Sequence, residues 1–494
     1  MATISATGAA LVWYRRDLRL ADNPALHAAT QSGRPLILVF IDQRDRSLGA
    51  APGAAADWWL HGSLARLASD IADRGGQLTL LRGDPAALIP KLAREHDIAE
   101  AFWNRSGEPA IDARDRMIAE SLKAKGTVPH AFAGTTLIDP GTLLTGAGTP
   151  YKVFGAFWRA ALRDLAPKPA LPAPERLLMA ESQPAGERLA DWSLRPSNPD
   201  WAPGFDTQWQ PGEAGAAERL ERFLDRAFES YAEGRDRPDQ PGTSMLSPHL
   251  GFGETSPRQV WHSVQARLAA GASFQAAERF LAEIGWRDFA YYLLHHFDDL
   301  RTTNFNRRFN GFPWRSDRPG FTAWTRGQTG IPLVDAGMRQ LWTTGWMHNR
   351  ARMVCASFLV KHLRCDWREG MVWFEHTLVD ADRAVNAASW QWVAGSGADA
   401  APYFRIFNPV RQGERFDPEG NYVRQWVPEL AEMPKRWIHA PWSAPAATRQ
   451  AAGLRLGASY PLPVRDLALG RDEALAAYRD IKGGSDGSEP RGAQ

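Results

Sequence analysis

Short apolar runs alternate with helical patterns over the first 135 residues, and this alternation constrains the fold more than any other feature. Candidate strands lie at 11–14, 36–41, 78–81 and 101–103. Between them we expect one helix that begins at Asn23-Pro24, one from about 57 to 73 and one that begins at Asp84-Pro85. A further helix follows the fourth strand and ends near 125. Strands that alternate with helices of this length indicate a parallel sheet. The sequence therefore predicts an α/β domain with a doubly wound parallel sheet at 1–135.

The turn after the first predicted strand reads Arg15-Arg16-Asp17-Leu18-Arg19. A dinucleotide-binding sheet carries glycines in this turn, because the backbone must approach a pyrophosphate closely. This turn contains no glycine. We therefore expect any cofactor chemistry to lie elsewhere in the chain.

The rest of the chain is predicted to be mainly helical. A length of 494 residues exceeds what one hydrophobic core usually supports. Pro, Ala, Ser and Gly are frequent from about 165 to 215, which indicates an inter-domain connector at 136–215. We expect a larger all-α domain at 216–480 and a disordered, polar tail at 481–494.

The composition excludes several classes of protein. Cys355 and Cys365 fit neither a redox pair nor a zinc-binding spacing, so we expect buried thiols in a reducing, cytoplasmic setting and no metal site. No apolar run reaches the roughly 18 residues of a membrane span, and the first ten residues do not resemble a signal peptide. The net charge of +2 neither demands nor excludes a nucleic-acid partner.

Hydroxyl side chains and glycines gather in one segment of the predicted helical part. It reads Thr243-Ser244-Met245-Leu246-Ser247-Pro248-His249-Leu250-Gly251-Phe252-Gly253. Such a segment offers hydroxyl and backbone N–H donors to a phosphate. A plain turn is the commoner meaning of this composition, so both interpretations stay open at this point.

The stretch 278–296 predicts an amphipathic helix on which Glu283 shares a face with Phe280, Trp286 and Arg287. An ion pair above core packing would explain this face. A site in which a base stacks on the indole while its polar edge meets the carboxylate would explain it too.

Two more segments combine polar and small residues in a way that suits a ligand better than an amphipathic stripe. At 346–353, Asn349 and Met353 share a face. At 380–392, acidic residues and an asparagine are followed by small residues and two tryptophans. The second pattern suggests close packing around a bound molecule.

Several long motifs, in the same order, resemble those of the photolyase/cryptochrome flavoprotein family. They lie at 12–20, 243–253, 345–350, 366–370, 390–392 and 399–409, and the resemblance runs from about residue 10 to 475. It is greatest to bacterial cyclobutane pyrimidine dimer photolyases of class I or III. The resemblance implies a FAD in the helical domain, which agrees with the glycine-free first turn.

The resemblance also implies which residues hold FAD. The expected phosphate-binding residues are Tyr231, Thr243, Ser244, Met245, Leu246 and Ser247. Asp380 and Asp382 are expected beside the ribose and flavin, with Arg352 as the ion-pair partner of Asp380. Asn386 matches the residue that faces flavin N5. The family's electron-transfer chain matches Trp390, Trp367 and Trp314, from proximal to distal, although core packing is the default role for most of the 21 tryptophans.

The same resemblance indicates the substrate. Photolyases that repair six-four photoproducts have His at the positions of Asn349 and Met353, so this pattern favours cyclobutane dimers. Glu283 matches the carboxylate that contacts the flipped dimer, and Trp286 matches its stacking platform. Further residues expected at the lesion or the DNA surface are Arg235, Phe280, Arg287, Arg350, Trp392 and Gln412.

The resemblance bears on the antenna pigment as well. Trp58-Trp59 resembles the class III subgroup, which uses a folate, whereas Ala110-Ile111 replaces the Asn-Glu pair that several relatives use for folate. We expect methenyltetrahydrofolate rather than 8-hydroxydeazaflavin, with no antenna as a further alternative.

The implied function is light-dependent repair of ultraviolet-damaged DNA by a monomeric lyase that associates with the nucleoid. The competing interpretations are a cryptochrome photoreceptor of the same fold and a generic electron-transfer flavoprotein. The complete set of dimer-site residues disfavours both, and the short tail after residue 480 also disfavours a cryptochrome.

Overall fold

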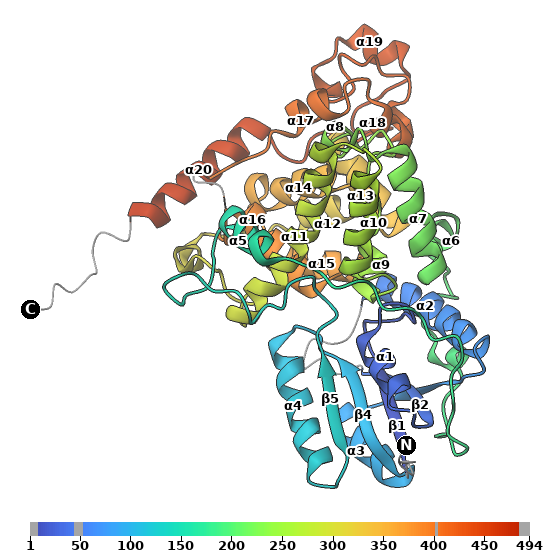
Figure 1. Cartoon of the computed structure of the whole chain (residues 1–494). Helices are drawn as coiled ribbons and strands as arrows, with labels where there is room; N and C mark the ends of the chain where they lie inside the picture. Colours follow the sequence, from blue (N-terminus) through green and yellow to red (C-terminus); the bar gives the residue numbers. More distant parts are fainter. Residues whose placement is uncertain (1–7, 44–52, 401–403, 484–494) are drawn as a thin grey trace, which may run out of the picture. The chain divides into compact units, whose positions relative to one another are not determined.

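The computed structural model describes residues 8–43, 53–400 and 404–483. The chain forms two compact units. The first unit spans 1–232, 244–298 and 379–382, and the second spans 233–243, 299–378 and 383–494. Figure 1 shows that the N-terminal part of the chain forms a sheet with helices and that the rest of the chain is mainly helical.

A five-stranded parallel sheet forms the centre of the N-terminal region, in the order β3-β2-β1-β4-β5. The strands are β1 (Ala9–Tyr14), β2 (Leu36–Asp42), β3 (Leu78–Arg82), β4 (Ile98–Asn104) and β5 (Val128–Phe132). The connecting helices are α1 (Pro24–Gln31), α2 (Ala54–Ala72), α3 (Pro85–Glu95) and α4 (Pro109–Lys123). Asn23 and Asp84 cap α1 and α3 through their side chains, as the sequence indicated.

The order of the strands places the helices on both faces of the sheet. Right-handed crossovers put α1 and α2 on one face and α3 and α4 on the other. Leu11 and Trp13 of β1 pack in one buried cluster with Ile89 of α3 and Ile118 of α4. The doubly wound α/β fold predicted for this region is confirmed.

Helices complete the first unit. They are α5 (Phe154–Asp164), η1 (Leu189–Trp192), α6 (Pro203–Gln208), α7 (Glu213–Arg226), α9 (Ser247–Phe252), α10 (Pro257–Ala269) and α11 (Phe274–His296). Helix α5 lies inside the stretch expected to be a connector and packs against α11, where a side chain at Gly285 would collide with Trp158. The boundaries of the compact units therefore do not coincide with the expected ones at 135 and 215.

The second unit is helical throughout its described part. Its elements are η2 (Arg307–Gly311), α12 (Arg318–Thr325), α13 (Pro332–Thr344), α14 (Asn349–Ser357), η3 (Phe358–His362), α15 (Trp367–Thr377), α16 (Arg383–Ala394), α17 (Pro409–Phe416), α18 (Asn421–Trp426), η4 (Pro428–Leu430), η5 (Pro441–Ser443), α19 (Ala446–Ala451) and α20 (Leu467–Gly483). The short helix α8 (Tyr231–Gly234) lies where the chain passes from one unit to the other.

Three smaller expectations can be compared with the structure. Cys355 and Cys365 are free and buried, as predicted. Helix α20 extends to Gly483, so the first three residues of the expected disordered tail are helical, and 484–494 lie outside the described residues. Within the described ranges, no helix is long and apolar enough to cross a membrane.

Candidate functional site

The segment 379–382 brings two distant motifs together within the first unit. Oγ of Ser247, the first residue of α9, donates to Oδ2 of Asp380 over 2.6 Å. Asp380 is 9% exposed. Its carboxylate is held by the hydroxyl of Ser247, which lies 133 residues earlier in the chain. Just before α9, Met245 has a φ of 52°, a left-handed conformation that side chains rarely adopt. The loop and the acidic segment therefore form one local arrangement.

Asp382 is held by two residues of α11. The hydroxyl of Tyr291 donates to Oδ2 of Asp382 over 2.9 Å, and Nε of Arg287 lies 3.9 Å from the same oxygen. Burial lowers the pKa of Arg287, but the electrostatic interactions with the acidic groups of Tyr291, Asp382 and Asp288 outweigh it, so the pKa is raised and the guanidinium stays charged. We name these residues, Tyr291, Arg287 and Asp382, the Asp382 clamp.

The N-terminal motif also contacts this region. Nη1 of Arg16 donates to the carbonyl oxygens of Gly251 and Ala381, over 3.4 and 3.3 Å. The guanidinium also lies over the ring of Phe252, 5.3 Å from its centroid. Arg16 thus joins the turn after β1 to both α9 and the acidic segment. Neither Arg16 nor Tyr291 was among the predicted site residues.

Helix α11 presents Glu283 and Trp286, and its 23 residues are capped at the start by Ser273. Both side chains are half-buried. The indole of Trp286 stacks on Phe154 of α5, with centroids 3.9 Å apart and planes at 14°. This stacking fixes the indole on the same helix face as the carboxylate, as the spacing predicted.

Two residues expected at the lesion or the DNA surface lie inside the first unit instead. Phe280 is 3% exposed and packs against Phe223 and Tyr231, with centroids 4.6 and 5.4 Å apart. The side chain of Arg287 is 10% exposed and donates to the carbonyl of Thr135 over 2.7 Å. Both pack inside the first unit in this structure, and their contact with the lesion or with DNA stays a prediction.

In the second unit, Trp390 of α16 is 2% exposed and lies within an aromatic group. Its ring centroid lies 5.0 Å from Phe374 and 6.2 Å from Trp324. A side chain at Gly370 of α15 would collide with the indole, so a glycine is needed for this close approach. Trp390 is thereby packed directly on α15, the helix that begins at Trp367.

The other two predicted electron carriers differ in exposure. Trp367 is fully buried, and its Nε1 donates to Oδ1 of Asn304 over 2.9 Å. Trp314 is half-buried and packs against Phe312, with centroids 4.5 Å apart. The backbone N–H of Arg315 donates to the carbonyl of Arg364, which ties the Trp314 segment to the loop before α15. Exposure therefore increases from the two inner indoles to Trp314.

Asn386 and Arg352 are oriented by backbone carbonyls of the second unit. Nδ2 of Asn386 donates to the carbonyl of Met371 over 3.0 Å, and Asn386 is 8% exposed. Nε of Arg352 donates to the carbonyl of Met347 over 2.6 Å. One of the two N–H groups of the Asn386 amide is used in this way, and the bond fixes the orientation of the side chain. The pairing of Arg352 with Asp380 stays a prediction.

Helix α14 begins with the pair predicted from the sequence. Nδ2 of Asn349 lies 4.0 Å from Sδ of Met353, and Asn349 is exposed, so both side chains lie on one face. Arg350 beside them is 17% exposed, pairs with Asp236 over 2.5 Å and lies over the ring of Phe416. This ion pair reduces the charge that Arg350 offers to an outside partner.

The remaining predicted residues of the second unit are half-buried. They are Arg235, Thr243, Trp392 and Gln412. Nε1 of Trp392 donates to the carbonyl of Asp399 over 3.1 Å. Oε1 of Gln412 is covered and has no hydrogen-bond partner among the described residues. Their roles at DNA stay predictions.

Comparison with known proteins adds independent findings. Residues 10–175 match the family model described as DNA photolyase, and 280–480 match the one described as FAD binding domain of DNA photolyase. The chain is 48% identical to the deoxyribodipyrimidine photo-lyase of Agrobacterium fabrum, over 96% of this chain and 98% of the relative. It is 38% identical to cryptochrome-1 of Arabidopsis thaliana, over 96% of this chain and 70% of that protein.

A solved structure is similar to this chain over nearly its whole length. The crystal structure of a bacterial class III photolyase from Agrobacterium tumefaciens matches with a TM-score of 0.94 and 47% identity, covering 98% of this chain and all of that one.

Proposed function

The chain belongs to the photolyase/cryptochrome family, and from this premise we propose that it is a light-driven enzyme that splits cyclobutane pyrimidine dimers in DNA. The observation that carries the proposal is the half-buried face of α11, where Glu283 lies one helical turn from an indole held by Phe154. The Asn349–Met353 pair supports the same substrate.

The residues present fit a FAD. The cofactor needs donors for its phosphates, acceptors for its ribose and flavin, and a polar group at N5. In the first unit, Ser244 would supply a hydroxyl donor, and Asp380 and Asp382 would supply carboxylates that Ser247 and Tyr291 hold in place. In the second unit, Asn386 would supply an amide group that is oriented by Met371. When bound and reduced, FAD supplies the excited-state electron that opening of a cyclobutane ring requires.

The dimer must leave the duplex before it can reach this chemistry. Flipping costs little for a lesion that is already poorly stacked. Trp286 would stack against the flipped pyrimidines, because its indole is already fixed in position by Phe154. Glu283 would hold their polar edge and stabilise the negative charge that develops on the dimer. The reaction is redox-neutral overall, since the electron returns after the ring opens.

The three predicted tryptophans serve a different step, the supply of electrons to oxidised cofactor. We propose that an electron enters at the half-buried Trp314 and passes inward through Trp367 to Trp390. The hydrogen bond from Trp367 to Asn304 offers a neutral acceptor, while the guanidinium of Arg368 lies over the ring, 4.7 Å from its centroid.

The finer parts of the proposal concern the antenna and the setting. We propose a folate antenna, based on the pair Trp58-Trp59. Nε1 of Trp59 donates to the carboxylate of Glu254 over 3.0 Å. An absorption spectrum of purified protein, with and without added methenyltetrahydrofolate, tests this. We further propose that the protein acts as a monomer at the nucleoid, where its substrate is found.

Repair and photoreception can be separated by one experiment. Chemically reduced protein is illuminated with an oligothymidine that contains cyclobutane dimers, and recovery of the thymine absorbance is followed. We expect recovery, and we expect Glu283→Ala to lower the repair yield with little loss of DNA binding. Absence of recovery with intact, FAD-loaded protein would favour a photoreceptor. Recovery only with six-four lesions would contradict the roles of Asn349 and Met353.

A further inference from the structure

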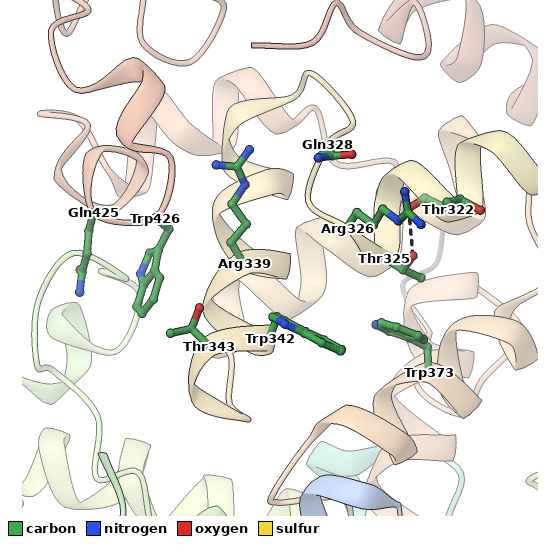
Figure 2. A pocket seen from close by; sticks show the side chains of 10 residues that line it. All are labelled: Thr322, Thr325, Arg326, Gln328, Arg339, Trp342, Thr343, Trp373, Gln425 and Trp426. Carbon is green, nitrogen blue, oxygen red and sulfur yellow. Dashed lines mark hydrogen bonds between the residues drawn. The ribbon is translucent and has the colours of Figure 1, made fainter. Parts of the chain in front are cut away.

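A cavity of about 870 Å³ opens on the second unit among α12, α13, α15 and α18 (Figure 2). Its walls combine three indoles, two guanidinium groups, and threonine and glutamine side chains. Small-molecule sites typically have volumes of about 300–1,000 Å³. None of the residues assigned above to FAD, electron transfer or the dimer lines this cavity.

Two of the indoles form a broad aromatic surface. Figure 2 shows Trp342 of α13 and Trp373 of α15 extending toward each other, with Trp426 of α18 on the other side of Trp342. The planes of Trp342 and Trp373 differ by only 10°, and their centroids lie 6.3 Å apart. Trp342 is 53% exposed. An indole left this open offers its face to a flat ring.

The charge of the cavity favours an anion. Arg326 is exposed and forms no ion pair with any described residue. Arg339 is already fixed, by Glu429 over 2.8 Å and by the carbonyl of Gly327 over 2.9 Å. The lining residues that the structure describes include no carboxylate. One uncompensated positive charge therefore lies at the edge of an aromatic surface.

We propose that this cavity binds a nucleotide, with the base stacked on Trp342 and the phosphate at Arg326. A flat ring with an attached anion is the ligand that matches the open indole of Trp342 and the exposed guanidinium of Arg326 together. The nucleotide could be a free one or an unpaired nucleotide of a DNA strand. The site is separate from the proposed repair reaction, so either proposal can fail without the other.

Calorimetric titration of FAD-saturated protein tests the proposal, because saturation removes the FAD site as a competitor for AMP. The ligands are AMP, adenosine and inorganic phosphate. Trp342→Ala should weaken binding of both AMP and adenosine by about tenfold or more. Arg326→Ala should weaken AMP about threefold while leaving adenosine unchanged. Phe274→Ala and Arg471→Ala, at exposed positions elsewhere, should change neither affinity.

Further variants and ligands sharpen the result. Trp342→Phe keeps an aromatic face and should retain most of the affinity, which separates stacking from a disturbed fold. An undamaged single-stranded oligonucleotide that displaces AMP would assign the site to a DNA strand, and failure to displace it would assign the site to free nucleotides. Lack of AMP binding, or equal AMP affinity in wild type and Trp342→Ala, overturns the proposal.

Discussion

Replacement of Tyr291 by Phe removes one hydroxyl from the Asp382 clamp. This hydroxyl donates to Asp382 over 2.9 Å, and Tyr291 and Asp382 are 4% and 6% exposed. Burial, followed by the charge of Asp382, raises the pKa of Tyr291, so the phenol keeps its proton over the working pH range. Arg287 lies 3.9 Å from the same oxygen, beyond hydrogen-bond distance, and cannot replace the lost bond without moving.

The size of the effect follows from the ionised acceptor. A hydrogen bond to a charged group contributes about 1.5–3 kcal/mol, more than a bond between neutral groups. If Asp382 contacts FAD only in the orientation that Tyr291 imposes, this energy is lost from cofactor binding. Since about 1.4 kcal/mol corresponds to a factor of ten, the affinity for FAD should fall roughly tenfold to 100-fold.

The assay is titration of apoprotein with FAD, followed by flavin fluorescence, and the matched control is Tyr292→Phe. Tyr292 is the next residue of α11 and is fully buried. Within the part of the chain that the structure describes, its hydroxyl donates to the carbonyl of Leu143 and accepts from the backbone N–H of Tyr151, and both groups are neutral. The control should lower the free energy of unfolding without changing FAD affinity. If the two variants bind FAD equally well, Asp382 does not depend on Tyr291 and the clamp has no role in cofactor binding.

Three further predictions concern buried positions. Burial raises the pKa of Asp288 to about 7, so the stability that its protonated form contributes should be lost as pH rises from about 4 to 7. In denaturant unfolding, the free energy of unfolding of Asp288→Asn should fall less over this pH range than that of wild type. An equal fall in both proteins would contradict the raised pKa. Gly370→Ala would drive a methyl group into Trp390, so it should lower the free energy of unfolding by about 1–3 kcal/mol and slow the photoreduction of FAD. An unchanged rate of photoreduction would show that Trp390 need not stay in place. Burial lowers the pKa of Lys361, so this residue destabilises the fold increasingly as pH falls below the pKa of the unfolded chain. Lys361→Met should have a higher Tm than wild type at neutral pH, and the difference in Tm should narrow near pH 10. A difference in Tm that does not depend on pH would argue against a neutral amine in the folded protein.

The sequence predicted four of the five strands, and the one it missed has a physical explanation. Strand β5 carries Pro129 and no apolar run, and all its side chains are exposed or half-buried. It pairs only with β4, at the edge of the sheet, where a residue without an N–H is tolerated. Hydrophobic patterning identifies strands buried on both faces and loses an edge strand of this kind.

Helical periodicity located the face of α11 but could not determine how deep each side chain lies. It placed Arg287 beside Glu283 correctly, yet the guanidinium turns inward because Asp382, 95 residues later in the chain, provides a charge for it. The sequence does place Arg287 and Tyr291 four residues apart, on one helix face, which was an available signal for the clamp. It does not show that Asp382 is the partner of both, because contacts between distant segments are set by tertiary packing.

The glycine-free turn after β1 lacks the close backbone approach that a dinucleotide-binding sheet offers to a pyrophosphate. Its arginines bond the protein itself: Arg15 pairs with Asp115, Arg16 reaches Gly251 and Ala381, and Arg19 donates to the carbonyl of Gly253 over 2.9 Å. A side chain at Gly253 would collide with the backbone of Arg16, so the glycine lies in α9's C-terminal turn and not in the sheet's first turn. The close backbone approach that elsewhere receives a pyrophosphate is used here to fasten α9 and the acidic segment, the two elements proposed to hold FAD, to the end of the sheet.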